Sequence, residues 1–318
     1  MSTRPGLLIV TNRADFAADF LITRLLELDL PYFRLDADVL VSARLSSWIG
    51  QGSEETRICL EGKRVELSTI GCVWYRRQLR PSTLDGVSRP FRTFAAAELQ
   101  HLYEGLLHAR TRWVNPLLAT EAAERKLFQL RLAPSCGLLV PPTLVSSDQD
   151  ELLAFARQGP VVCKPASQGF LSTGSEQFAV YTREVTVDEI RQQEDCGHFP
   201  TLLQRRVEKG VDVRVTIIGR KVFPVEVRTP SDAPVDWRAV PEGVSYAQCT
   251  IPASVERGCR ELMSRLHLEY GAFDFIRTPN QEWYFLEVNP AGEWAWLEVA
   301  LALPMREAFV HLFFGEGK

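Results

Sequence analysis

The sequence contains few lysines, no long apolar segment and no closely paired cysteines. Six lysines occur among 318 residues and the net charge is −4, so the composition excludes a general binder of nucleic acids or anionic membranes. No apolar run reaches the length of a membrane span, and the N-terminus lacks a signal-peptide pattern. We therefore expect a cytoplasmic protein that has no nucleic-acid partner and no membrane partner.

Two kinds of site are also disfavoured. The seven cysteines are dispersed, without a Cys-x-x-Cys pair or a His-rich partner motif, which argues against a disulfide framework and against a zinc site. The Gly-Lys-Ser/Thr sequence of a Walker phosphate-binding loop is missing as well. A phosphate site in this chain therefore needs another arrangement.

The chain is long enough for two or three domains with a large core. Residues 6–12, 15–28 and 30–35 have the patterns of a strand, a helix and a strand, an order that predicts a parallel sheet. Helices and strand pairs follow, so the predicted class is α/β with α+β character. We expect domains at residues 1–113, 114–187 and 188–318.

Two of the six lysines lie on predicted elements that follow one another. A helix predicted over residues 115–132, with Asn115 as its cap, carries Lys126. Lys164 ends a short buried strand, and the small polar residues 166–175 after it have the character of a mobile loop. A lysine in that position can place its ammonium on phosphate oxygens beneath loop amides. The alternative is a lysine that reaches solvent from a strand end.

Gln204, Arg205, Val207 and Glu208 lie where a predicted strand approaches a glycine-containing bend. The backbone of such a segment can offer C=O and N–H groups to an adenine edge, and an acid beyond it can reach ribose hydroxyls. An amphipathic edge strand fits the same pattern equally well.

Two arginines lie on the next predicted hairpin. With a strict two-residue turn, Arg214 pairs with Val225, and Arg228 faces the other side of the sheet. A one-residue bulge at Pro224 would turn Arg228 onto the face of Arg214, because proline cannot donate to the strand ladder. Both arginines could then capture a carboxylate or a phosphate. Without the bulge, Arg228 is a solvated side chain.

Acidic side chains gather on a hairpin predicted within residues 271–298. A tight turn would place Asp274 opposite Phe285 and diagonal to Glu287, with Asn289 on the same face. Two carboxylates about 7–8 Å apart repel each other by roughly 2 kcal/mol at an effective dielectric near 20, so we expect a cation between them. Oxygen ligands of this kind suit Mg²⁺. The alternative is a half-exposed hairpin with solvated acids.

The order of these features resembles the ATP-grasp superfamily over residues 114–318, with the first domain similar to the family's pre-ATP-grasp domain. The resemblance implies an ATP-grasp fold with an N-terminal α/β domain, a small central domain and a C-terminal antiparallel-sheet domain. It also implies ATP and Mg²⁺ as cofactors. The implied roles are phosphate binding by Lys126 and Lys164, nucleotide binding by Gln204, Arg205, Val207 and Glu208, and Mg²⁺ binding by Asp274, Glu287 and Asn289.

Three stretches resemble the microviridin-type peptide ligases, or graspetide synthetases, within this superfamily. They are Val10–Arg13 with Asp15 and Asp19, Val73–Arg77, and Glu287–Trp294. The resemblance implies a precursor peptide, with a leader and an acidic, hydroxyl-rich core, as the partner. Its Asp or Glu side chains would be phosphorylated and then attacked by Ser, Thr or Lys of the same peptide, giving ester or amide rings.

In this chemistry Arg214 and Arg228 would stabilise the acyl phosphate. Asp212 would orient Arg214 or help to remove the proton of the nucleophile, and the loop 166–175 would exclude water. We also expect a homodimer. Two alternatives stay open: a RimK-like or glutathione-synthetase-like carboxylate–amine ligase, and an ATP-binding regulatory protein without turnover.

Overall fold

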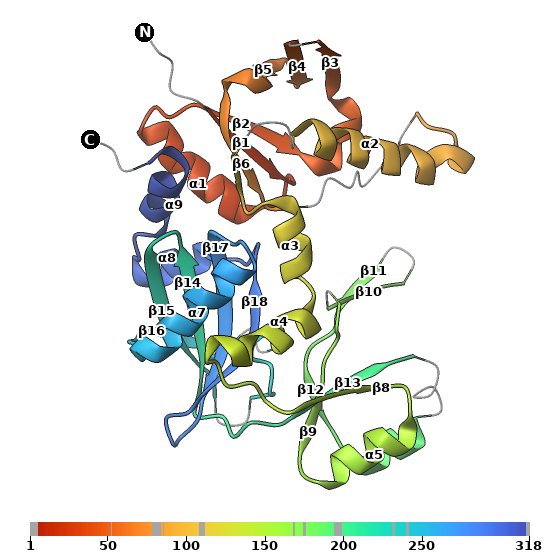
Figure 1. Cartoon of the computed structure of the whole chain (residues 1–318), viewed down its shortest axis with the longest axis vertical. Helices are drawn as coiled ribbons and strands as arrows, with labels where there is room; N and C mark the ends of the chain where they lie inside the picture. The colour runs from red at the N-terminus through yellow and green to blue at the C-terminus, as the bar shows by residue number, and fades with distance from the viewer. Residues whose placement is uncertain are drawn as a thin grey trace.

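The computed structural model describes residues 6–51, 53–77, 84, 86–107, 112–167, 169–173, 176–193, 199–230, 233–239 and 242–315. The N-terminal sheet lies above the C-terminal sheet in Figure 1, and the central sheet lies below and to one side. The two lower sheets come from sequence segments that follow one another, and the C-terminal helix returns to the N-terminal part.

The N-terminal part is built on a parallel sheet in the order β2-β1-β6-β7. Its elements are β1 (Gly6–Thr11), α1 (Phe16–Glu27), β2 (Tyr32–Asp36), η1 (Ala37–Ser42), β6 (Ile70–Tyr75), η3 (Arg89–Phe91), α2 (Arg92–Leu107) and β7 (Arg112–Val114). The predicted strand–helix–strand unit with a parallel sheet is confirmed. Asp15 caps α1, because its carboxylate accepts from the backbone N–H of Ala18.

A second, antiparallel sheet lies beside this one. It consists of β3 (Arg44–Gly50), β4 (Ser53–Leu60) and β5 (Lys63–Glu66), followed by η2 (Leu67–Thr69). The sequence of β3 lacks the alternation of polar and apolar residues that marks a half-buried strand. In the structure, four successive residues of β3 are exposed.

The central part has the sheet order β12-β9-β13-β8. Its elements are α3 (Leu117–Ala123), α4 (Lys126–Leu132), η4 (Ala133–Cys136), β8 (Thr143–Ser146), α5 (Gln149–Arg157), β9 (Val161–Cys163), β10 (Phe170–Thr173), β11 (Glu176–Ala179), β12 (Arg183–Val185), α6 (Val187–Gln192) and β13 (Thr201–Arg205). The predicted boundary near residue 187 precedes α6, whereas β13 returns to this sheet and pairs with both β8 and β9.

Two predictions for this part were wrong. The single helix predicted over residues 115–132 is two helices, because Arg125 has extended backbone angles and separates α3 from α4. Lys126 therefore stands at the start of a helix. The segment predicted to be a loop after Lys164 contains the strand β10, which pairs with β11 in a hairpin.

The C-terminal part is an antiparallel sheet in the order β16-β15-β14-β17-β18. Its elements are β14 (Val211–Ile218), β15 (Lys221–Arg228), η6 (Trp237–Ala239), β16 (Ser245–Gln248), α7 (Ala253–Arg265), β17 (Tyr270–Arg277), β18 (Trp283–Asn289), α8 (Ala295–Leu301) and α9 (Met305–Phe314). One face of the sheet packs on α7, where Phe273, Phe275 and Phe285 are buried with Leu262.

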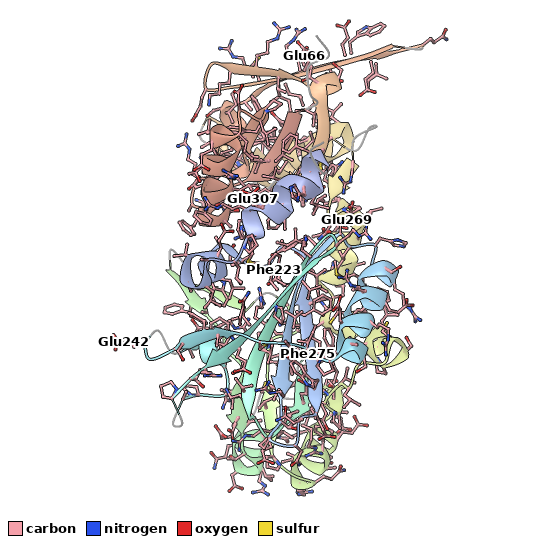
Figure 2. All side chains as sticks on the ribbon, turned by 90° about the vertical axis from the view of Figure 1, so that its left-hand side faces the viewer. Glu66, Phe223, Glu242, Glu269, Phe275 and Glu307 are labelled. Atoms are coloured by element: carbon pink, nitrogen blue, oxygen red, sulfur yellow. The ribbon has the colours of Figure 1, made fainter. Side chains whose placement is uncertain are left out.

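The N-terminal and C-terminal parts share one hydrophobic core. Trp74 of β6 lies 5.3 Å from Phe309 of α9 between ring centroids, and Trp294 lies 4.8 Å from the same ring. Figure 2 shows Glu307 on α9 at this junction, where it forms an ion pair with Arg24 of α1. This packing holds residues of the first domain close to the chain after β18.

Asn115 joins the same two parts by hydrogen bonds. Its Nδ2 donates to the carbonyls of Tyr270 and Pro290, both at 2.8 Å, and its Oδ1 accepts from the backbone N–H groups of Glu269 and Tyr270. The predicted capping role was wrong, because Pro116 holds the cap position of α3 and the Asn115 side chain is buried. Its four bonds, to Tyr270 of β17, to Glu269 before it and to Pro290 after β18, instead stabilise the junction.

Within the described ranges, no helix is long and apolar enough to cross a membrane. The six cysteines that the structure describes are free thiols.

Candidate functional site

A cleft of about 820 Å³ lies between the central sheet and the C-terminal sheet. Its walls come from β9 and β13 on one side and from β14, β17 and β18 on the other. Eleven of the twelve residues predicted for the site line it: Lys126, Lys164, Gln204, Arg205, Val207, Glu208, Asp212, Arg214, Arg228, Asp274 and Glu287. Asn289 is exposed at the end of β18, and its Oδ1 accepts from the backbone N–H of Ala291 at 3.0 Å.

Three charged residues stand in a row across neighbouring strands of the C-terminal sheet. Arg214 of β14 pairs with Asp274 of β17, which in turn pairs with Glu287 of β18. The predicted pairing of Asp274 with Phe285 was wrong, because a bulge shifts the register after Asp274 and Leu286 is the extra residue. Directly opposite residues are closer than diagonal ones, so the two carboxylates are nearer to each other than the sequence predicted.

Cationic side chains of the protein surround these carboxylates. The Nη1 of Arg214 lies 2.9 Å from both oxygens of Asp274, and the Nζ of Lys126 lies 3.3 Å from Oε2 of Glu287. The Nη1 of Arg238 lies 3.7 Å from Oε1 of Glu287. Burial of Glu287 opposes its charged form, but the charges of Lys126, Arg238 and Lys164 outweigh that cost and lower its pKa.

The two predicted lysines meet at the same end of the cleft. Lys164 is largely buried, and its Nζ donates to Oε1 of Gln204 at 2.7 Å. Lys126 donates to the carbonyl of Pro165, the residue after Lys164, at 3.1 Å. Burial lowers the pKa of Lys164 to about 8, aided by the positive charges of Lys126 and Arg238 and opposed by Glu287. An anion placed between these ammonium groups would be stabilised by both.

The segment predicted to read the nucleotide base lies along the cleft, but Arg205 turns its side chain away. The Arg205 guanidinium donates to the carbonyls of Gly159 and Phe155 and lies 4.2 Å from the Phe155 ring centroid. Its backbone N–H donates to the carbonyl of Pro142. Any contact of Arg205 with a ligand in the cleft therefore has to come from its backbone carbonyl.

Asp212 is buried beside the charged row, two residues before Arg214. Its Oδ2 accepts from the Nζ of Lys209 at 2.9 Å, whereas Arg214 is bonded to Asp274. Burial raises the pKa of Asp212 to about 6 against the lowering effect of Lys209, and Asp274 and Asp236 raise it further. These contacts hold Asp212 to Lys209 and give no support to the predicted role of orienting Arg214.

Arg228 lies on the opposite face of the sheet from Arg214. The pairing of β14 with β15 continues without a shift through Pro224, so the bulge that would have brought the two arginines together is not formed. The Arg228 guanidinium is 61% exposed and donates to Glu226, which also pairs with Arg277. The predicted joint action of Arg214 and Arg228 therefore lacks its structural basis.

Arg238 is a charged residue of the cleft that the sequence analysis did not identify. Its guanidinium donates to both oxygens of the buried Asp236 at 2.8 and 2.9 Å, and it approaches Glu287. Trp237, between them, packs on Trp296 of α8 at 5.7 Å between ring centroids. The surrounding residues have no periodic pattern, and only the adjacent Asp-Trp-Arg sequence could have drawn attention to them.

The N-terminal part reaches the edge of this site through Arg76. Its guanidinium donates to Asp15 at 2.7 and 3.1 Å and to the carboxylate of Glu293 at 2.9 Å, and Arg77 also pairs with Glu293. The backbone carbonyl of Glu293 accepts from Nη2 of Arg214 at 3.2 Å. Glu293 therefore connects the first domain to the charged row in the cleft.

The residues fit a hard divalent cation. Asp274 and Glu287 stand directly opposite each other on one face of the sheet, and Asn289 follows two residues after Glu287 on the same strand. Carboxylate and amide oxygens are the ligands that Mg²⁺ prefers. Within the described ranges, no group of three or more His, Cys, Asp or Glu forms a metal site, and the predicted set contains two acids and one amide.

Comparison with known proteins finds a family model that matches the first domain and solved structures that match the whole chain. Residues 6–121 match the model of the MvdD pre-ATP grasp domain. A comparison with curated proteins finds no match.

Two similar solved structures are peptide macrocyclases from Microcystis aeruginosa MRC. MdnC bound with precursor peptide MdnA is 26% identical, with a TM-score of 0.86 over 98% of this chain and 100% of that chain. MdnB is 28% identical, with a TM-score of 0.80 over 98% and 99%. The RiPP-associated ATP-grasp ligase of Chryseobacterium gregarium, in complex with ADP and a leader and core peptide, shares the fold at 24% identity, with a TM-score of 0.89 over 98% and 97%.

The predicted three-part ATP-grasp architecture is thus confirmed along nearly the whole chain. Residues 6–121 thus match the model of the MvdD pre-ATP grasp domain, and the chain as a whole has an ATP-grasp fold similar to that of the macrocyclases MdnC and MdnB.

Proposed function

We propose that this protein is an ATP- and Mg²⁺-dependent ligase that forms macrocyclic ester or amide crosslinks in a ribosomally made precursor peptide. The observation that carries the proposal is the similarity to MdnC, a macrocyclase bound with its precursor peptide, over 98% of this chain. The cleft supports it, because eleven of the twelve residues predicted from the sequence line one cavity.

The first step is transfer of the γ-phosphoryl group of ATP to an Asp or Glu carboxylate of the peptide. A carboxylate is a poor electrophile, and phosphorylation converts it to an acyl phosphate with a good leaving group. Phosphoryl transfer needs mainly positioning and charge neutralisation. Lys126 and Lys164 are the cations that bind the ATP phosphates. Arg214 and Arg238, which contact Asp274 and Glu287, stabilise charge on the transferred group.

Asp274, Glu287 and Asn289 are the residues that would hold Mg²⁺. When bound, Mg²⁺ neutralises the β- and γ-phosphate oxygens. Structures that share this fold have been solved with ADP and Mg. Lys126 then exchanges its contact with Glu287 for one with phosphate.

The second step is attack of a Ser or Thr hydroxyl, or a Lys amine, of the same peptide on the acyl phosphate. The nucleophile forms a bond to the acyl carbon, inorganic phosphate leaves, and the proton of the nucleophile has to be accepted. Asp212 is suited to this because its raised pKa, about 6, leaves it ionised at neutral pH and basic enough to accept a proton. The reaction has to take place away from water, which would hydrolyse the acyl phosphate.

Incubation with ATP, Mg²⁺ and a candidate precursor peptide tests the proposal. Mass spectrometry should record the loss of one water mass for each ring, and an equal amount of inorganic phosphate should be released. A carboxylate–amine ligase of the RimK or glutathione-synthetase type would instead release phosphate with free amino acids. An ATP-binding regulatory protein would bind ATP without releasing phosphate.

The proposal also covers the location of the reaction and the oligomeric state of the protein. We infer that the reaction takes place in the cytoplasm, where ATP and newly made peptide occur together. We also infer a homodimer, in which exposed apolar side chains such as Phe91 and Phe94, 63% and 66% exposed, become covered. Light scattering of the purified protein tests for the homodimer, because it separates the mass of one subunit from that of two.

A further inference from the structure

The strand β18 carries two of the predicted Mg²⁺ ligands and is the last strand of the C-terminal sheet, beside β17. On its outer side, Leu139 bridges Tyr284 and accepts from the N–H of Phe285, three residues before Val288. Glu287 and Asn289 flank Val288, which is buried. An edge strand leaves alternate backbone N–H and C=O groups without a strand partner. The positions of the two ligands therefore depend on what holds the free edge at Val288.

Gln129 of α4 holds this edge. Its Nε2 donates to the carbonyl of Val288 at 2.8 Å, and its Oε1 accepts from the N–H of Val288 at 2.7 Å. Its Nε2 also donates to the carbonyl of Ala123. The side-chain amide is 2% exposed and takes the place of a neighbouring strand, because it satisfies both backbone groups of one residue.

The helix α4 thus contacts β18 at two successive residues. Lys126, three residues before Gln129 and on the same helix face, pairs with the Glu287 side chain, while Gln129 holds the backbone of Val288. The two contacts differ in what happens when a nucleotide binds. Lys126 is assigned to the ATP phosphates and moves away from Glu287 when they bind. The Gln129 amide bonds only backbone groups, so these bonds remain when a nucleotide binds.

We propose that Gln129 is a positioning residue that fixes Glu287 and Asn289 in the geometry that Mg²⁺ requires. The inference rests on the proposed function, since it concerns the metal of the same reaction. Asp274 is fixed by β14 and by Arg214 on its other side. Gln129 therefore sets the position of the Glu287 carboxylate relative to the Asp274 carboxylate. Loss of partners that orient metal ligands lowers metal affinity by roughly 10–100-fold.

Two variants test this role without turnover. Gln129→Met keeps the approximate side-chain volume and removes both bonds to Val288. Gln129→Glu keeps the acceptor for the Val288 N–H and removes the donor to the Val288 carbonyl. Calorimetric titration of Mg²⁺ into each ADP-saturated variant should give a dissociation constant about 10–100 times that of the wild type. The affinity for ADP without Mg²⁺ should stay unchanged, an outcome that a general structural defect would not produce.

Gln149→Met is the matched control. The Gln149 amide also donates to a backbone carbonyl, that of Ile190 at 2.9 Å, but this bond joins α5 to α6 and does not involve β18. Its Mg²⁺ dissociation constant should equal that of the wild type. A folded Gln129 variant with wild-type Mg²⁺ affinity would overturn the proposal.

If neither Gln129 variant folds, hydrogen exchange of the Val288 amide in the wild type tests the positioning role of Gln129. Because linkage is reciprocal, a contact that strengthens Mg²⁺ binding must itself be strengthened by Mg²⁺. The Val288 amide should exchange more slowly with ADP and Mg²⁺ together than with ADP alone, and equal rates would refute the positioning role. A wild-type protein that binds no ADP would instead refute the proposed function, while a rapidly exchanging Val288 amide in the free protein would refute the Gln129 contact itself.

Discussion

Arg214 and Asp274 face each other across β14 and β17, and one guanidinium nitrogen of Arg214 lies 2.9 Å from both carboxylate oxygens of Asp274. Arg214 is 8% exposed, and its second terminal nitrogen donates to the carbonyl of Glu293. The pair therefore links the centre of the cleft to the chain segment that contacts the first domain.

Removal of Arg214 should destabilise the protein through the acid that it leaves behind. Arg214→Ala leaves the Asp274 carboxylate without its strongest partner, and we expect a loss of about 3 kcal/mol in the free energy of unfolding. Asp274→Asn in the same chain should recover about 1–3 kcal/mol of that loss. Denaturant unfolding of the two single variants and the double variant measures the coupling. Additive losses would mean that the pair does not interact in solution.

Glu287→Gln should abolish ring formation and leave the fold intact. The substitution removes a charge that Lys126 and Arg238 neutralise and that Mg²⁺ requires, while the amide keeps the shape of the side chain. We expect the rate of ring formation to fall by at least about 100-fold, since a direct ligand matters at least as much as a supporting residue. Peptide mass spectra report the rings, and circular dichroism reports the fold. Retained activity would remove Glu287 from the metal site.

Arg238 should matter more for the reaction than Arg228. Arg238 approaches Glu287, whereas Arg228 lies on the opposite face of the sheet from Arg214 and pairs with Glu226. Arg238→Ala should lower the rate of phosphate release with peptide by about 100-fold or more, as expected for a residue that stabilises transferred charge. Arg228→Ala should change it by a much smaller factor. The reverse order would restore Arg228 to the role that the sequence predicted.

Nucleotide binding should draw protons onto Lys164 at mildly alkaline pH. The pKa of Lys164 is about 8 in the free protein because the ammonium is buried, and a bound phosphate would raise it. Binding of ATP at pH 8 should therefore take up about half a proton. Calorimetry in buffers of different ionisation enthalpy measures this uptake. Lys164→Arg, which stays charged throughout, should bind without it, and equal uptake in both proteins would assign the proton to another group.

Asp15 should contribute to acid stability in a defined range of pH. Burial opposes its charged form, but the hydrogen bonds and charge of Arg76 outweigh that cost and lower its pKa from 3.8 to about 2. Its stabilising effect, about 2 kcal/mol, is complete above pH 4 and is lost as the pH falls through 2. Asp15→Asn should therefore flatten the decline of unfolding free energy between pH 4 and pH 2. An unchanged slope would contradict the assigned pKa.

The sequence predicted which residues line the cleft better than it predicted how the strands beneath them pair. Lys126, Lys164, Asp274 and Glu287 could be selected because lysines are scarce and because the alternation of side chains along two paired strands puts both acids on one face. The pairing of Asp274 with Glu287 could not, since the bulge at Leu286 depends on how β18 packs and leaves no mark in the alternation. Arg238 was missed for a related reason, because an irregular segment carries no periodicity from which a face can be inferred.

The sequence by itself determined the parallel sheet of the first domain, the antiparallel C-terminal sheet and most of the groups that line the cleft. These features follow from local periodicity and residue type, which do not depend on how distant segments of the chain pack. Only the tertiary structure decided which groups meet. Gln129 holds Val288 across 159 positions of sequence, and Arg76 reaches Glu293 across 217. Hydrophobic cores shared by distant segments bring these groups within hydrogen-bonding distance.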